Sequence, residues 1–286
     1  MKIVFFGSSH NVIPIIDVLK ETSDLKLVVT TDNSGSSYIR LVGFVDSYCR
    51  LNKIPFTCSL EINDKLINVI KKLKPDLGVV ANFGVILPEK LIKIFPKGIL
   101  NIHPSLLPKY RGPTPVQSAI LNGEIKTGVT LIKIDSKIDH GPIIDREEFK
   151  LKPSDNSQKA LYELFEKGAV LLRKNLNDYF TGNIKPKPQN HAQATFTRVL
   201  KREDGFVNVS KFPSFEKLDR MIRAYFPWPG VWTRLRLSSG GQAKIIKFLP
   251  NKQIQVEGKK EMSYKDFLNG YPEADSKLRR YLETNV

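Results

Sequence analysis

Five short apolar runs recur along the first half of the chain, with helical stretches between them. They are residues 3–6, 25–30, 77–81, 99–103 and 130–134, all rich in Val, Ile or Leu. Their apolarity is continuous rather than alternating, which is typical of strands that are covered on both faces in a parallel sheet with crossover helices. This pattern predicts an α/β fold.

The clearest helix signal begins at "PSDNS", residues 153–157. Ser154 or Asp155 offers an N-cap, and apolar residues follow at helical spacing, namely Leu161, Leu164, Phe165, Leu172, Leu176 and Tyr179. This helix should close a first domain, 1–181. A polar linker over 182–200 should lead to a second domain, 201–286. There the pieces "DGFVNVS", "VWTRLRLS", "AKIIKFL" and "KQIQVEG" predict strands of a small β-barrel.

The charge balance points to an anionic partner. The chain has 45 Lys and Arg against 29 Asp and Glu, a net charge of +16, which attracts nucleic acid, phosphorylated metabolites or anionic lipid. The longest uncharged apolar segment, 77–88, is shorter than the roughly 20 residues of a membrane helix. The start of the chain lacks the features of a signal peptide, and Cys49 and Cys58 are expected to be reduced, so we expect a cytoplasmic protein.

One polar pair interrupts an apolar run, in "ILNIHPSLLPKYRG", residues 99–112. On a strand, Asn101 and His103 share a face, and we expect them at the carboxyl end, where open α/β sheets bind ligands. They either satisfy loop backbone groups or work in catalysis, where the imidazole would serve as a base. A catalytic histidine needs an orienting carboxylate, and Asp135 and Asp139 in "LIKIDSKIDHGPII" are both candidates that spacing does not separate.

These motifs resemble the formyltransferase family that uses 10-formyltetrahydrofolate. The resemblance rests on "NIHPSLLPKYRG" and "TGVTLIKIDSKIDHGPI", with further matches in "KIVFFGSS", "NFGVILP" and "RGPTPVQSAILNGEIKTGVT". Beyond the linker, "TRVLKREDGFVNV" and "MIRAYFPWPGVWT" resemble the junction and C-terminal domain of the members that formylate methionyl initiator tRNA. The resemblance implies a Rossmann-like formyltransferase domain with a mainly parallel sheet, followed by a small OB-like β-barrel that binds tRNA.

The resemblance also implies a site and a reaction. The amino group of methionyl initiator tRNA would attack the formyl group of the folate, with Asn101 stabilising the oxyanion, His103 taking a proton and Asp139 holding the tautomer of His103. No metal is expected. Folate would be bound by Phe83, Gly84, Val85, Ile86, Leu87, Pro88, Ser105, Leu106, Leu107 and Pro108. Contacts to tRNA are expected from Arg40, Arg111, Lys201, Arg202, Arg234, Arg236, Lys244 and Lys247. We expect a monomer, with His10 as a surface loop residue.

One stretch departs from the family and keeps an alternative open. Residues 30–40 contain one basic residue, Arg40, where related enzymes carry several that enter the tRNA acceptor end. Sugar-nucleotide N-formyltransferases, which share the donor and the catalytic trio, are therefore the main alternative. Glycinamide ribonucleotide formyltransferases normally lack the "FPWPGVW" segment. A tRNA-binding protein without activity is disfavoured because all three catalytic residues are present.

Overall fold

The computed structural model describes residues 1–31, 45–237, 241–274 and 276–284. Contacts between Cα atoms divide the chain into two compact units. The first contains residues 1–115, 126–150 and 161–197, and the second contains residues 116–125, 151–160 and 198–286. This division differs from the expected boundaries of 1–181, 182–200 and 201–286. Most of the expected linker lies in the first unit, because Lys187 pairs with Ile143 and Phe196 pairs with Arg111 through backbone bridges.

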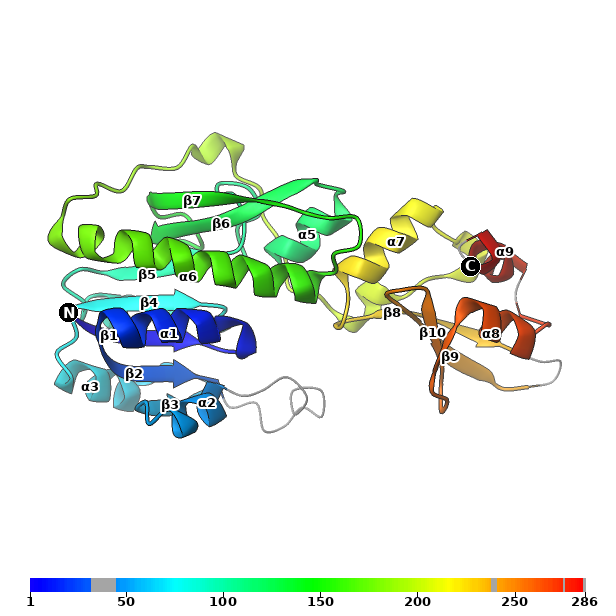
Figure 1. Ribbon diagram of the computed structural model, residues 1–286, viewed down its shortest axis with the longest axis horizontal. Coiled ribbons are helices and arrows are strands. Elements are labelled where there is room, and N and C mark those ends of the chain that lie inside the picture. Colours follow the sequence, from blue (N-terminus) through cyan, green and yellow to red (C-terminus); the bar gives the residue numbers. More distant parts are fainter. Residues whose placement is uncertain (32–44, 238–240, 275, 285–286) are drawn as a thin grey trace. The chain divides into compact units, whose positions relative to one another are not determined.

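The first unit is built around a seven-stranded sheet (Figure 1). Its spatial order is β3 (Phe56–Cys58), β2 (Asp24–Thr30), β1 (Lys2–Gly7), β4 (Leu77–Ala81), β5 (Ile99–His103), β6 (Lys126–Lys133) and β7 (Ile143–Lys150). The first five strands are parallel, whereas β6 and β7 are antiparallel to their neighbours. The five predicted strands are confirmed, and the mainly parallel sheet has the Rossmann-like form expected. The apolar runs did not reveal β3 or β7, which contain polar and charged residues.

Helices cover both faces of this sheet. The helices of the N-terminal half of this unit are α1 (Ile13–Thr22), α2 (Val45–Leu51), α3 (Asp64–Lys72) and α4 (Glu89–Ile92), whereas α5 (Pro115–Leu121) falls almost wholly in the second unit. The long helix α6 (Ser157–Thr181) and α1 lie along the face turned to the viewer in Figure 1. Asn156, rather than Ser154 or Asp155, caps α6, because its Oδ1 atom accepts a hydrogen bond from the Lys159 N–H at 2.9 Å.

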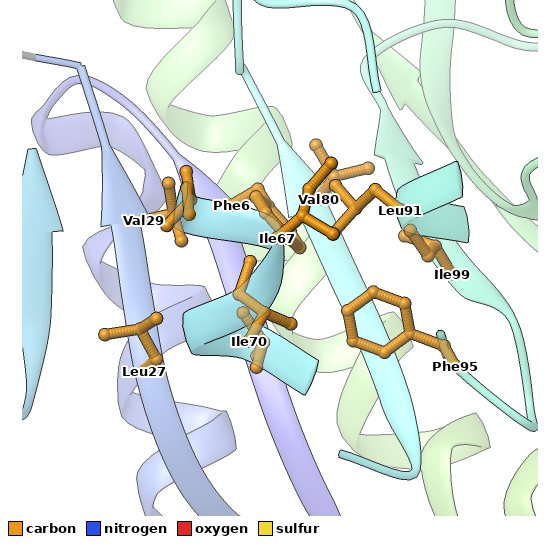
Figure 2. Close-up of a cluster of buried hydrophobic side chains, with 11 residues drawn as sticks. Phe6, Leu27, Val29, Ile67, Ile70, Val80, Leu91, Phe95 and Ile99 are labelled. Carbon is orange, nitrogen blue, oxygen red and sulfur yellow. The ribbon is translucent and has the colours of Figure 1, made fainter. Parts of the chain in front are cut away.

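The opposite face carries a core cluster (Figure 2). Alternate residues of the strands, including Phe6 and Val80, pack there against α3 and α4. Helix α3 suits this position because Leu66, Ile67 and Ile70 lie on one side of it and the Asn63 side chain caps its first turn. The cluster consists of Val4, Phe6, Leu27, Val29, Leu66, Ile67, Ile70, Val80, Leu91, Phe95 and Ile99.

The second unit contains a four-stranded antiparallel sheet and three helices that follow the linker. The strand order is β11 (Glu261–Ser263), β10 (Gln253–Val256), β9 (Ala243–Leu249) and β8 (Val231–Arg236). The helices are α7 (Phe215–Ala224), α8 (Tyr264–Gly270) and α9 (Ser276–Thr284). Along β8, buried Val231, Thr233 and Leu235 alternate with more accessible residues, so one face of the sheet packs inward. This sheet agrees with the expected small β domain.

One expected strand is absent from the described part of the second unit. The stretch "DGFVNVS" forms 3-10 turns, and its only pairing is a single bridge between Phe206 and Trp232. Asn208 competes with strand pairing, since its side chain accepts a hydrogen bond from the Ser210 N–H. Helices α7, α8 and α9 were not predicted from the sequence.

Candidate active site

The polar pair of strand β5 lies where the sequence placed it. Asn101 is partly buried and His103 is 5% exposed, at the carboxyl end of the strand. Both side chains approach one carboxylate. The Asn101 Nδ2 atom donates to Asp139 Oδ1 at 2.9 Å, and His103 Nδ1 lies 3.6 Å from Asp139 Oδ2. Asp139, which follows Asn101 by 38 positions and His103 by 36, thus joins them at this edge of the sheet.

The structure separates the two candidate aspartates. Asp135 contacts His140, whose Nδ1 atom lies 2.6 Å from Asp135 Oδ2. Asp139 contacts the pair from β5, and its Oδ2 atom also accepts a hydrogen bond from the Gly112 N–H at 2.8 Å. The carboxylate of Asp139 is therefore held by donors from two different segments, β5 and the loop that follows it.

A backbone carbonyl fixes the protonation of His103. The Nε2 atom lies 2.9 Å from the carbonyl oxygen of Tyr110. Since a carbonyl oxygen only accepts, Nε2 carries the proton, and in the neutral ring Nδ1 is the atom that takes up another. The contact from Nδ1 to Asp139 is too long for a hydrogen bond. The tautomer is therefore set by Tyr110, a residue that sequence reasoning missed, rather than by Asp139.

Two residues at this site have unusual backbone conformations. Tyr110 has φ of 61° and Asp139 has φ of 47°, in the left-handed region that residues other than glycine rarely occupy. Such conformations persist only where the surroundings hold them in place, and they concentrate at functional sites. Here they present the Tyr110 carbonyl and the Asp139 carboxylate to the same imidazole ring.

The two expected folate-binding loops follow neighbouring parallel strands, β4 and β5, so both begin at the same edge of the sheet. In the first loop, Ile86 is 81% exposed, while Phe83 packs its ring against Phe6 at 5.8 Å. In the second, Ser105 and Leu107 are fully buried, and Leu107 donates its N–H to Thr130. Gly84 is exposed, and Val85, Leu87, Pro88, Leu106 and Pro108 are partly buried.

The basic residues expected to contact tRNA fall into three groups. Arg40 lies outside the described residues. Arg111 is only 3% exposed, and its guanidinium contacts Gln189 and His191. Burial lowers the pKa of Arg111, and the nearby carboxylates of Asp139 and Asp135 oppose this effect. The remaining residues are all exposed, namely Lys201, Arg202, Arg234, Arg236, Lys244 and Lys247.

The strand register of the second unit places several of these side chains on one face. Arg234 and Arg236 alternate with buried residues of β8, and Lys247 on β9 pairs with Trp232, which shares their face. The Arg202 guanidinium lies 5.3 Å from the centre of the Trp232 indole ring. We call Arg202, Arg234, Arg236 and Lys247 the basic face. Lys244 pairs with buried Leu235 and belongs to the opposite face.

The structure also bears on His10, the two cysteines, metal binding and membrane helices. His10 is half-buried beside Tyr162 rather than fully at the surface, and burial lowers its pKa. Neither Cys49 nor Cys58 takes part in a disulfide among the described residues. Among the described residues, no His, Cys, Asp and Glu side chains form a group that suits a metal ion. No helix within the described ranges is long and apolar enough to cross a membrane.

Comparison with known proteins identifies the family. Residues 1–172 match the Formyl transferase family. A methionyl-tRNA formyltransferase of Roseiflexus castenholzii is 49% identical over 174 residues, which cover 61% of this chain and 54% of the relative. The chain thus spans about half the length of that relative. A methionyl-tRNA formyltransferase of Koribacter versatilis is 33% identical over 98% of this chain and 99% of its own length.

Solved structures share the fold at lower identity. A 4-N formyltransferase from Francisella tularensis has a TM-score of 0.67 at 19% identity, covering 88% of this chain and 98% of its own. A methionyl-tRNA formyltransferase from Clostridium thermocellum has a TM-score of 0.59 at 18% identity, and the match covers 92% of this chain and 98% of that one. The extent of the family match and the nearly full-length relative agree with the geometry at β5. The chain therefore belongs to the formyl transferase family, among the methionyl-tRNA formyltransferases.

Proposed function

We propose that this protein transfers a formyl group from 10-formyltetrahydrofolate to the α-amino group of methionyl initiator tRNA in the cytoplasm. The observation that carries the proposal is the convergence of Asn101 and His103 on the carboxylate of Asp139. The relatives named above are methionyl-tRNA formyltransferases, and one of them matches over nearly its whole length. The folate supplies the activated formyl group, and the protein supplies orientation and proton transfer.

The three polar side chains have distinct roles in this proposal. One N–H of the Asn101 amide is used by Asp139, and its second N–H has no acceptor in the part of the chain that the structure describes. That N–H is suited to the formyl oxygen as negative charge develops on it. His103 takes the proton of the attacking amine on Nδ1, and the Asp139 carboxylate then faces the cationic ring at 3.6 Å. The bond between the formyl carbon and N10 of the folate then breaks, and N10 leaves with that proton.

The loops after β4 and β5 suit a flat, partly apolar donor. Exposed Ile86 and partly buried Val85 and Leu87 present apolar surface next to backbone groups that are able to form hydrogen bonds. Ser105 and Leu107 are buried, so we assign them to the support of the second loop rather than to direct contact. In this role Ser105 donates its hydroxyl to the Lys109 carbonyl oxygen at 2.7 Å.

We further propose that the basic face of the second unit binds the tRNA backbone. Arg234, Arg236 and Lys247 are exposed on one side of the sheet, and Arg202 lies beside Trp232 of that side, so these cations are accessible to phosphates. The partly buried ring of Trp232, beside Arg202, adds an aromatic surface on which an unpaired base stacks. Arg234→Ala should lower the slope of log affinity against log salt by about one. The control variant Lys72→Ala, on helix α3, should keep the wild-type slope.

The acceptor is tested directly. Purified protein is incubated with 10-formyltetrahydrofolate and either methionyl initiator tRNA, the same tRNA without its amino acid, or a panel of amino-sugar nucleotides. We expect formylation of methionyl tRNA alone. The solved structures with this fold include sugar N-formyltransferases, one of them determined with dTDP and a formyl folate. Formylation of the sugars without the tRNA would therefore replace our proposal with that second function.

A further inference from the structure

A glutamine from the segment expected to be a linker supports the loop of Asp139. Gln189 is 6% exposed. Its Nε2 atom donates to the carbonyl oxygens of Asp139 and Gly141, at 2.8 Å each. These two residues flank His140, so the amide spans the turn that presents the Asp139 side chain.

A buried arginine orients this amide. The Gln189 Oε1 atom accepts hydrogen bonds from Arg111 Nη2 at 2.7 Å and from Arg111 Nε at 3.3 Å. Since guanidinium only donates and backbone carbonyls only accept, one orientation of the amide satisfies both sides. Both N–H groups and both lone pairs of the amide are then used. The Arg111 guanidinium therefore ensures that Gln189 presents donors, and not its oxygen, to the loop of Asp139.

The same segment also supports the loop that fixes His103. Thr195 Oγ1 accepts a hydrogen bond from the Tyr110 N–H at 2.8 Å. Backbone hydrogen bonds join Arg111 to Thr195 and Thr197, at 2.9 and 2.7 Å. Tyr110 and Asp139 are both held in left-handed conformations, and each is hydrogen-bonded to a residue of 189–197. External support of this kind is what such conformations require.

We propose that Gln189 is a positioning residue for formyl transfer, which, oriented by Arg111, holds the Asp139 carboxylate against Asn101 and His103. This inference rests on the proposed function, because it assumes that Asp139 acts in the reaction. It also gives Arg111 a role inside the first unit instead of the phosphate contact that the sequence suggested.

The principal test is Gln189→Glu. The side chain keeps its size and its contact with Arg111, but it presents a carboxylate oxygen to two carbonyl oxygens that need donors. We expect kcat to fall on the order of 10²-fold, as misplacements near 1 Å do, with KM for both substrates unchanged. The matched control is Gln193→Glu, an exposed glutamine in the same segment that receives the same charge change. If Gln189→Glu lowers kcat no more than this control does, the inference is overturned.

A double-mutant cycle with Asp139→Asn separates positioning from general damage. If Gln189 acts through Asp139, the double variant should be no slower than Asp139→Asn alone. Losses that multiply would overturn the role of Gln189 and leave the proposed function intact. Wild-type kcat in Asp139→Asn would instead refute the catalytic role of Asp139. The cycle is run with whichever acceptor the wild-type protein formylates.

Folding is controlled by a second variant and a second measurement. Gln189→Met has nearly the same shape and no polar atoms, so it removes both hydrogen bonds without adding charge. Amide hydrogen exchange of residues 135–141 needs no substrate and should be faster in both Gln189 variants than in Gln193→Glu. A folded Gln189→Met protein with wild-type kcat overturns the inference. Its failure to fold would assign Gln189 to stability, which also overturns it.

The role of Arg111 is tested in parallel. Arg111→Met leaves the Gln189 oxygen without its donors and frees the amide to turn over, so we expect kcat to fall while KM for tRNA stays unchanged. A raised KM for tRNA with unchanged kcat would show that Arg111 serves the acceptor instead of the loop.

Discussion

Gly141→Ala is the substitution whose effect the structure determines most directly. A Cβ atom built on Gly141 would lie 1.8 Å from the carbonyl oxygen of Lys133 at the end of β6, whereas Cβ atoms essentially never approach within 3.0 Å. The obstacle is backbone, so the loop that carries Asp139 must move by roughly 1 Å. A misplacement of that size costs about 10²-fold in rate, and we expect kcat of Gly141→Ala to fall by this factor.

The assay is steady-state formyl transfer with both substrates varied, together with circular dichroism of the purified variant. Gly270→Ala is the matched control, because nothing lies within 4 Å of a Cβ built there. We expect the control to keep wild-type kcat. A folded Gly141→Ala protein with wild-type kcat would show that the position of the Asp139 loop does not limit the reaction, and would refute the reasoning.

Substitutions at three further positions test the site, the core and the pH dependence of stability. Asn101→Ala should lower kcat by about 10²–10³-fold, the usual loss for an oxyanion donor, and Asn101→Asp should be slower still because it sets a second carboxylate beside Asp139. Phe6→Ala empties a fully buried site and should cost about 3–5 kcal/mol of stability in urea unfolding. Local desolvation and the positive charges of His140 and Arg111 lower the pKa of His191 below 6.5. The unfolded chain then binds this proton more tightly, so stability rises with pH up to about 6.5, and His191→Gln should flatten that rise in Tm.

The parts of the fold that sequence predicted are those fixed by local pattern. Strand β5 has the bounds expected of it, because Ile99, Leu100 and Ile102 are buried and a strand covered on both faces reads as a continuous apolar run. The position of Asn101 and His103 on the same face of β5 followed from the two-residue period of a strand. The choice of Asp139 over Asp135 came from the family resemblance, and the contact at 2.9 Å agrees with it.

The parts that sequence missed depend on contacts between distant segments. Strand β7 reads as "IIDREEFK" and gains its place only by pairing with β6. Gln189 lies in a polar stretch without periodicity, and nothing in its neighbours indicates an approach to Asp139, 50 positions earlier. Tyr110 contributes a backbone carbonyl, which carries no sequence signal at all. The N-cap of α6 was predicted at Ser154 or Asp155 and lies at Asn156, because all three residue types are good N-caps.

In the proposed function, the residues that carry out formyl transfer differ from the residues that select the acceptor. In the proposed mechanism, Asn101, His103 and Asp139 act on the formyl group and the amine, which are common to every acceptor. They therefore leave open whether the amine belongs to a tRNA or to a sugar, and discrimination has to come from residues elsewhere. The basic face of the second unit suits a tRNA better than a sugar nucleotide, because a nucleic-acid backbone has many phosphates that bind many cations. We therefore expect variants of Arg234 and Arg236 to lose their preference for tRNA over sugar nucleotides while they keep the wild-type kcat.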